Sequence, residues 1–362
     1  MKVLLLEDFS SFHKYLKDGL CQCGVDVTLV SSGDGWKKIG GANYPLYDKQ
    51  IESKNKILRI LQIYKASIRI QDKLGEYDVI QIINPRIYSP FVNFFLVSKI
   101  LKKGRLKSLV CCGNDLALYK SYCNGQFDYS MYDGDNELKN EYRLNNLRGA
   151  FTRVTEPFIV RKVDLIIPTS YEYWVGYKND VRQTKVIPMP INVDSIEYKE
   201  NIIDGKIVFY HGIIRAGQKG TDIILKALNR LQEKYSDQVE IIVSNKMPFD
   251  QYVKTMDKAN VVIDQCRSYA YGINADIAMA QGKVVLSGAR KEALESLGVS
   301  KCPIFGIIPD ENQIYQQLEF IVMNRDKITL WGKESREYVE KVHDCKKVAK
   351  EYIKVWSKGL NE

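Results

Sequence analysis

Two cationic side chains, Arg215 and Lys219, lie four residues apart in a glycine-containing stretch, residues 206–220, which reads KIVFYHGIIRAGQKG. The apolar residues 207–210 predict a strand, and a helix is expected to begin at Thr221. Backbone N–H groups at a helix start attract anions, and glycine lets a phosphate approach the chain. A guanidinium fork beside an ammonium suits a diphosphate. The alternative is an ordinary loop whose basic side chains lie in solvent.

Polar residues in the first half follow other predicted strands. Asp115 lies in a Gly-Asn-Asp turn after residues 106–111, and His13 lies in the loop after residues 3–6. A carboxylate or an imidazole at a strand end can act as a general base. Residues 10–11, both serines, can offer N–H or hydroxyl contacts to a phosphate. The alternatives stay open: Asp115 caps the next helix, and His13 is a surface or capping residue.

Strands and helices alternate through two halves of the chain and would position these residues. Residues 3–30 read as strand, helix and strand, a βαβ unit whose crossover rule makes the strands parallel. The pattern begins again at residue 206, after the proline-containing linker at residues 186–190. We therefore predict an α/β fold of two doubly wound, Rossmann-like domains that face each other across a cleft. Its ligand should lie at the carboxyl ends of the strands.

The expected domain bounds follow from this pattern. They are residues 1–192 for an N-terminal, acceptor-binding domain, 193–335 for a C-terminal, nucleotide-sugar-binding domain, and 336–362 for a helix that packs back on the first domain. Residues 119–147 are polar with weak periodicity, which predicts a long irregular insertion used as a substrate loop. The Asp-Gly-Asp triplet at residues 133–135 is expected to be a solvated turn rather than a metal site.

The composition is typical of a soluble globular protein. Its 362 residues are enough for two cores, and hydrophobic (45%) and charged (27%) residues occur in ordinary proportions. No apolar run reaches the roughly 18–20 residues that span a bilayer, and the start, MKVLLLEDFSS, lacks a signal-peptide pattern. Eight cysteines and three histidines show no zinc spacing. We expect a cytoplasmic protein with free thiols and no metal.

A basic segment follows an apolar, aromatic one in the first half. Residues 99–107 (KILKKGRLK) carry five cations and no acid, and FVNFFLV precedes them, in a chain of net charge +9. One interpretation is a peripheral contact of residues 91–107 with the inner face of an anionic membrane. The alternative, which we favour, is an amphipathic helix that covers a sheet and ends in a solvated basic turn. Aromatic and cationic residues do not alternate, so no nucleic acid is expected as a partner.

Three stretches, in this order, resemble glycosyltransferase family 4 (group 1), the retaining enzymes of GT-B fold: HGIIRAGQKGTDIILKAL, VVIDQ and YGINADIAMAQGKVVL. The resemblance covers most of the chain and is strongest from residue 206 to 288. It implies transfer of a hexose from a nucleotide-diphosphate sugar to a glycan or lipid-linked acceptor, in surface polysaccharide or lipopolysaccharide biosynthesis. The nucleotide sugar, UDP- or GDP-linked, would be a co-substrate, and no cofactor is implied.

The resemblance also implies roles for particular residues. Arg215 and Lys219 match the basic pair that holds the diphosphate, and residues 244–247 follow a strand where relatives hold the nucleobase. Relatives often place a residue near the reacting hydroxyl where Asp115 lies. The other residues implied at the donor site are Gly220, Ser244, Asp264, Tyr271, Gly272 and Asn274.

The chain departs from the family at two carboxylates. The family has two glutamates, separated by seven residues, that grip sugar hydroxyls and the ribose, but here those positions are Tyr269 and Ile277. Asp276 adjoins the second position and is our candidate to replace it, although neighbours on a helix diverge by about 100°. Two alternatives to sugar transfer stay open: a nucleotide-sugar epimerase that uses His211 and Asp264, and a catalytically weak binding partner of GT-B fold.

Overall fold

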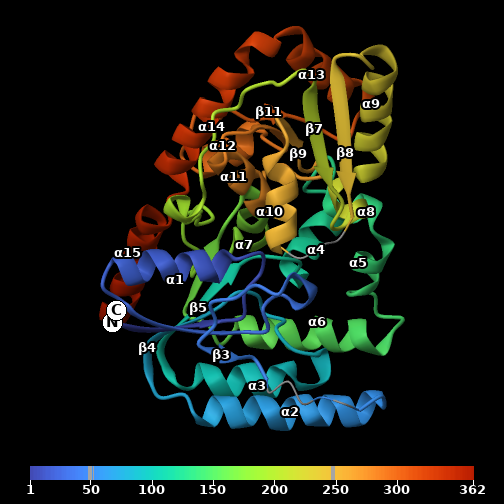
Figure 1. Ribbon diagram of the computed structural model, residues 1–362. Coiled ribbons are helices and arrows are strands. Elements are labelled where there is room, and N and C mark those ends of the chain that lie inside the picture. Colours follow the sequence, from blue (N-terminus) through green and yellow to red (C-terminus); the bar gives the residue numbers. More distant parts are fainter. Residues whose placement is uncertain (48–50, 52, 246–248) are drawn as a thin grey trace.

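The computed structural model describes residues 1–47, 51, 53–245 and 249–362. Two parallel sheets lie in separate halves of the chain, each between layers of helices (Figure 1). The first sheet has the strand order β3-β2-β1-β4-β5-β6. Its strands are β1 (Lys2–Leu6), β2 (Asp26–Ser31), β3 (Tyr44–Pro45), β4 (Tyr77–Ile82), β5 (Gly104–Cys111) and β6 (Leu165–Pro168). The predicted doubly wound α/β architecture is confirmed.

The first sheet is covered on both faces, as its continuous apolar strands require. In β1, four consecutive residues after Lys2 are buried. Helix α1 and the last helix of the chain, α15 (Cys345–Asn361), cover one face, and α2, α3 and α6 cover the other. The helices of this half are α1 (Phe12–Gln22), α2 (Lys56–Asp72), α3 (Pro90–Leu101), α4 (Leu116–Cys123), α5 (Asn136–Asn140), α6 (Leu147–Val160) and α7 (Tyr171–Tyr177), with 3-10 turns η1 (Gly35–Lys37) and η2 (Met131–Gly134).

The second sheet has the order β11-β10-β9-β7-β8 and is also fully parallel. Its strands are β7 (Ile207–Gly212), β8 (Val239–Ser244), β9 (Val261–Ile263), β10 (Val284–Ser287) and β11 (Phe305–Gly306). The elements around it are η3 (Val193–Ser195), α8 (Ala216–Lys219), α9 (Thr221–Lys234), α10 (Phe249–Asp257), α11 (Ile273–Ala280), α12 (Lys291–Ser296), α13 (Glu311–Met323), η4 (Arg325–Lys327) and α14 (Ile328–Val342). Helices α9 and α13 pack on one face, and α11 and α14 lie on the other.

The last helix returns to the first half of the chain. In Figure 1 the red α15 lies beside the blue α1. The two helices approach so closely at Gly19 that a side chain there would collide with the carbonyl of Cys345. Trp356 is fully buried in the same core cluster as Val3 and Leu5 of β1. The domain bounds themselves stay predictions.

Two predicted segments differ from the structure. Residues 336–362, expected as one helix, form the end of α14 and all of α15, because Asp344 caps a new helix by accepting a hydrogen bond from Lys347 N at 3.0 Å. Residues 119–147 are not irregular, since α4, η2 and α5 run through them around a small core with buried Tyr132 and Leu138. None of the helices in the described part of the chain has the length and apolar character that crossing a bilayer needs.

Candidate functional site

A cavity of about 490 Å³ lies between the two sheets, at the carboxyl ends of their strands. Its walls come from the segments that follow β1, β2, β4, β5 and β6 of the first sheet and β7 and β9 of the second. Parallel α/β sheets bind their ligands at this edge. The predicted location of the site is therefore where the structure has its cavity.

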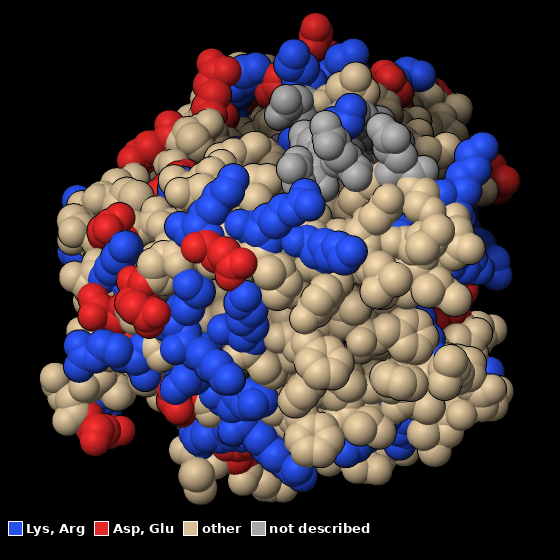
Figure 2. Space-filling view, turned by 90° about the horizontal axis from the view of Figure 1, so that it is seen from below, with Lys and Arg blue, Asp and Glu red and all other residues tan. Residues whose placement is uncertain are grey.

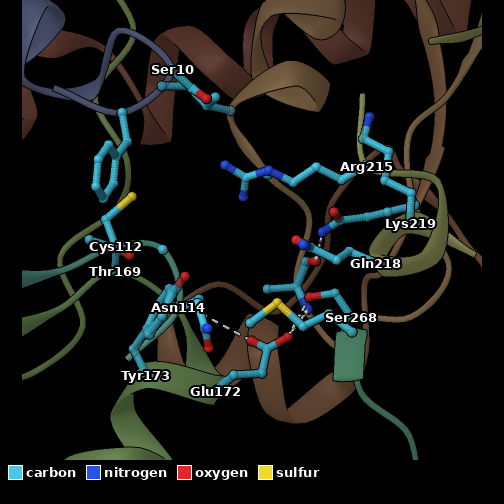
Figure 3. Close-up of a pocket in the computed structure, with 18 of the residues that line it drawn as sticks. Ser10, Cys112, Asn114, Thr169, Glu172, Tyr173, Arg215, Gln218, Lys219 and Ser268 are labelled. Atoms are coloured by element: carbon cyan, nitrogen blue, oxygen red, sulfur yellow. Dashed lines mark hydrogen bonds between the residues drawn. The ribbon is translucent and has the colours of Figure 1, made fainter. Parts of the chain in front are cut away.

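Arg215 is the side chain that enters this cavity most openly. It follows β7, it is exposed, and its guanidinium has no hydrogen bond or ion pair to any residue that the structure describes. Figure 3 shows it extended into the space between residues of the first half, such as Ser10 and Cys112, and residues of the second half. A free guanidinium in a concave site is available to bind an anion.

Lys219 is buried and ion-paired, unlike Arg215, although both residues line the cavity. Its Nζ donates to Asp264 Oδ1 at 2.7 Å, and both side chains are more than nine-tenths buried. Asp264 also accepts from Ser287 Oγ at 3.4 Å. Of the predicted pair of cations, the guanidinium has no partner among the residues that the structure describes, and the ammonium has its charge balanced by a buried carboxylate.

The helix start at the cavity is not the one expected from residues 206–220. The predicted glycine loop is the short helix α8, and Gly220, in the left-handed region with φ 74°, begins α9 outside the cavity wall. The N-terminus of α11 lines the cavity instead, through Tyr271, Gly272 and Asn274. Its first-turn N–H groups and the helix dipole create a positive field there.

Tyr271 joins a buried hydrogen-bonded group behind α11. Its hydroxyl lies 2.7 Å from Tyr338 Oη and 2.9 Å from His343 Nε2, and His343 Nδ1 lies 2.8 Å from Met189 O. Burial lowers the pKa of His343 to about 4, so the ring is neutral. Tyr271 therefore contributes to the cavity wall while its hydroxyl is engaged elsewhere.

Asp276, the candidate to replace the missing glutamate, does not line the cavity. It is completely buried, lies outside the cavity wall, and places Oδ1 3.5 Å from His343 Nε2. Burial raises the pKa of Asp276 well above its ordinary value. Because α11 is regular here, the one-residue offset turns this carboxyl into the core.

Ser244 also lies away from the cavity. It ends β8, is nine-tenths buried, and its hydroxyl lies 2.6 Å from Tyr210 Oη. Of the residues expected to hold a nucleobase, Lys246 and Met247 lie outside the described residues. A nucleobase contact in residues 244–247 stays a prediction.

The two residues predicted as general bases are both buried and do not line the cavity. His13 Nδ1 lies 2.5 Å from Glu7 O, Nε2 lies 3.1 Å from Gln81 Nε2, and burial lowers the pKa of His13 to about 4. Asp115 caps α4 by accepting from Leu118 N at 2.8 Å, and burial raises the pKa of Asp115 to about 6. The geometry favours the capping alternative for Asp115 and a core position for His13.

Strained backbone surrounds the first-half wall of the cavity. Within the described residues, non-glycine positions with positive φ occur only in the loops after β1 and β2: Glu7, Ser10, Ser11, Asp34 and Lys38. Asp34 Oδ2 accepts from Ser10 N at 2.9 Å and from Lys37 Nζ at 2.6 Å, and these three residues line the cavity. Such strain concentrates where a loop is held in a functional conformation.

Glu172, which the sequence did not reveal as a site residue, connects the two halves across the cavity. Its carboxylate accepts hydrogen bonds from Tyr269 N at 2.7 Å, Ala270 N at 3.2 Å and the hydroxyl of Ser268. Figure 3 shows Glu172 and Ser268 reaching toward each other from opposite sides. Its position at the start of α7, just after β6, was the available signal, but nothing local indicated the partner loop 96 to 98 residues further on.

The segment around the Asp-Gly-Asp triplet is a second connection between the halves. Gly134 and Gly217 touch so closely that a side chain on either would collide with the carbonyl of the other, and Gln218 Nε2 donates to Asp135 Oδ2 at 2.9 Å. Arg290, in the second half, pairs with Asp128 at 2.6 Å. The triplet is therefore a docking point between the halves and not the solvated turn expected. The described residues contain no cluster suited to a metal ion.

Comparison with known proteins shows which solved structures share this fold. No protein-family model matches the chain, and neither does any curated protein. The chain is similar over 99% of its length to solved structures: sucrose-phosphate synthase from Thermosynechococcus elongatus (15% identity, 99% of that chain, TM-score 0.62) and Anabaena HepE in complex with UDP and glucose (12%, 100%, 0.61). A third is UDP-GlcNAc 2-epimerase from Neisseria meningitidis bound to UDP-GlcNAc (12%, 100%, 0.54). The chain has a GT-B-like fold.

Proposed function

We propose that this protein is a glycosyltransferase that moves a sugar from a nucleoside-diphosphate sugar to a glycan or lipid-linked acceptor. The observation that carries the proposal is the guanidinium of Arg215, which has no partner among the described residues and lies in a cavity between two facing parallel sheets. The similar structures include complexes with UDP and glucose and with UDP-GlcNAc. The resemblance of residues 206–288 to glycosyltransferase family 4 points to the same chemistry, with retention at the anomeric carbon.

The site would act mainly through electrostatics. In the transfer, an acceptor hydroxyl attacks the anomeric carbon, the bond from that carbon to the diphosphate oxygen breaks, and the nucleoside diphosphate leaves with the electron pair. Arg215 and the N-terminus of α11 are directed at the space where this negative charge would develop. In many enzymes, preorganised donors of this kind stabilise the transition state more than any other group does. Lys219, paired with Asp264, would shape the wall and supply little net charge.

The cavity walls supply no free carboxylate for a separate base within the described residues. Each lining acid has a partner: Asp34 pairs with Lys37, Glu141 with Arg86, Asp264 with Lys219, and Glu172 binds backbone N–H groups. We infer that the proton of the acceptor hydroxyl passes either to the departing diphosphate oxygen or to a carboxylate released from one of these pairs.

Sugar epimerisation receives less support than transfer. Its two candidate residues were His211 and Asp264. His211 is completely buried outside the cavity wall, where its ring lies 2.9 Å from both Ile263 O and Thr221 Oγ1, and burial lowers the pKa of His211 to about 4. Asp264 is engaged with Lys219. Neither group is poised to remove a proton from a sugar carbon.

The test is incubation of the purified protein with UDP-, GDP- and ADP-sugars, using octyl glycosides as acceptors, beside the Arg215→Ala variant. Release of free nucleoside diphosphate together with a glycosylated acceptor, lost in the variant, is the expected result. Conversion of the sugar without release would identify an epimerase. If the protein binds nucleotide but neither releases nucleoside diphosphate nor converts the sugar with any donor, it is a binding partner, and the proposal is contradicted.

A further inference from the structure

Helices α2, α3 and α6 form a continuous outer surface that carries large exposed apolar residues. We call it the apolar face. Figure 2, seen from below, shows a broad area without charged residues, bordered by a band of Lys and Arg. Ile57 is 70% exposed, Phe95 60% and Leu147 67%. The other exposed members are Leu58, Leu61, Leu144, Phe151, Val154 and Phe158. Scattered apolar residues are ordinary on a surface, but a contiguous patch marks an interaction site.

Aromatic rings join α3 to α6 across this face. Phe91 and Phe151 lie with ring centroids 5.0 Å apart, and Phe94 and Phe158 lie 6.1 Å apart. Cations lie over the edge of this cluster, with Lys162 Nζ 5.5 Å from the centroid of Phe94. Aromatic rings next to cationic side chains are the arrangement that settles at the boundary between lipid headgroups and acyl chains.

The charge of these three helices is mainly positive. Two acids fall in the three helices: Asp72, which pairs with Lys99 at 2.7 Å, and Glu156, which is buried. The cations in and directly after the helices are Lys56, Arg59, Lys65, Arg69, Lys73, Lys99, Lys102, Lys103, Arg148, Arg153, Arg161 and Lys162. An anionic surface is the complementary partner, and each such cation near a lipid surface increases binding.

We infer that the apolar face docks on an anionic lipid bilayer, with the aromatic cluster entering the headgroup region and the basic border resting on the lipid charges. A second copy of the chain is a poorer occupant. A two-fold contact through this face would bring the same patch of each copy together, basic border included, and like charges would repel. Of the basic segment at residues 99–107, Lys99 lies in α3 and Lys102 directly follows it, whereas Arg105 and Lys107 lie in β5 and pair with Asp78 and Asp164.

The apolar face reaches the cavity along one short segment. Glu141 lines the cavity, and Leu144 and Leu147, three and six residues further on, are exposed. An acceptor whose lipid tail stays in the bilayer would therefore present its headgroup at the cavity entrance. This consequence rests on the proposed function, whereas docking on the bilayer does not.

The test is co-sedimentation with phosphatidylcholine vesicles, with and without phosphatidylglycerol, at low and at high salt. Binding to the anionic vesicles alone, lost at high salt, is expected. Phe95→Ser and the double variant Arg59→Gln/Lys65→Gln should weaken it, the double variant by about fivefold per cation removed. Matched controls in the other half, Phe320→Ser and Lys291→Gln/Lys333→Gln, should bind as the original protein does.

Several outcomes would overturn the inference. The inference is wrong if the protein binds neutral and anionic vesicles equally, or if it does not bind anionic vesicles at low salt. It is also wrong if the variants of the apolar face bind as the original protein does. A dimer in sedimentation velocity without lipid, dissociated by Phe95→Ser, would assign the face to a second copy. Transfer to octyl glycosides should be unchanged in Phe95→Ser, so failure of bilayer docking can be told apart from failure of the proposed function.

Discussion

The residues that we predicted for chemistry on the two walls of the cavity differ in where their side chains point. On the second sheet, the segment after β7 sends Arg215 into the cavity, and the segment after β9 brings the N-terminus of α11 to it. On the first sheet, the segments after β1 and β5 turn His13 and Asp115 into the core. A position at the carboxyl end of a strand therefore predicts the neighbourhood of a residue, but not the direction of its side chain.

Within the second wall, the same contrast separates two neighbouring cations. Arg215 is exposed without a partner among the described residues, whereas Lys219 is buried against Asp264. Both were expected to hold a diphosphate. The comparison predicts that Arg215 contributes to ligand affinity and that Lys219 contributes first to folding.

The largest effect is expected from Lys219→Met. Removing the ammonium leaves Asp264 as a buried charge without its cation, and breaking a buried pair in this way costs about 3–5 kcal/mol. Urea unfolding followed by circular dichroism measures the loss. The double variant Lys219→Met/Asp264→Asn should recover a large part of it. A loss in the single variant similar to that of an exposed lysine would show that the pair is not structural.

A smaller effect is expected from Glu172→Gln. The carboxylate accepts N–H donors from the loop of the opposite half, and charge-assisted hydrogen bonds contribute about 1.5–3 kcal/mol. The variant should also hold the two halves together less tightly, which small-angle X-ray scattering would detect as a larger radius of gyration. Glu295→Gln, at an exposed carboxylate that pairs with Lys291 within the second half, is the matched control and should leave that radius unchanged.

His13→Gln tests whether that ring is a core residue or a base. The pKa of His13 is about 4 in the folded protein and near 6.5 when unfolded, so between these values only the unfolded chain binds the proton. The stability from this residue is present above pH 6.5 and is lost as the pH falls, by about 2 kcal/mol from pH 7 to pH 5. The variant should lack this part of the pH dependence and keep its turnover. A large fall in turnover at pH 7 would restore the catalytic interpretation.

Asp115→Asn should have the smallest effect. Asparagine is as good an N-cap as aspartate, so the hydrogen bond from Leu118 N can be kept and the cost should stay below about 1 kcal/mol. Asp115→Ala, which removes the cap, is expected to cost about 1–2 kcal/mol more than that. If Asp115→Asn stops sugar transfer while the protein stays folded, Asp115 acts in the reaction.

The fold was predictable from the sequence because apolar strands, capped helices and a proline-containing linker are local signals. The edge of the sheets at which the cavity lies was predictable as well, because parallel α/β sheets bind their ligands at the carboxyl ends of the strands. What could not be predicted were contacts between distant segments. Glu172 meets a loop nearly 100 residues away, and Gly134 meets Gly217 across the cavity. No local pattern encodes such pairs, and the same is true of the ion pair between Lys219 and Asp264.

The direction in which a side chain points was equally hard to predict from the sequence. Asp276 is one residue from the position where the family has a glutamate, and that single step on α11 places it in the core beside His343. The break between α14 and α15 had a visible signal, since Asp344 is a good helix cap, but the apolar periodicity on both sides masked it.

The proposed function depends above all on Arg215 binding the diphosphate of a nucleotide. The decisive experiment is titration calorimetry of UDP and GDP into the original protein, Arg215→Ala and the control Arg325→Ala. Arg325 is an exposed arginine of the same half that donates to Gly205 O, far along the chain from the cavity segments. We expect Arg215→Ala to weaken nucleotide binding by about 100-fold, as a lost charge-assisted contact of about 2–3 kcal/mol implies, and Arg325→Ala to leave it unchanged. Equal affinity in all three proteins would show that Arg215 does not hold the diphosphate.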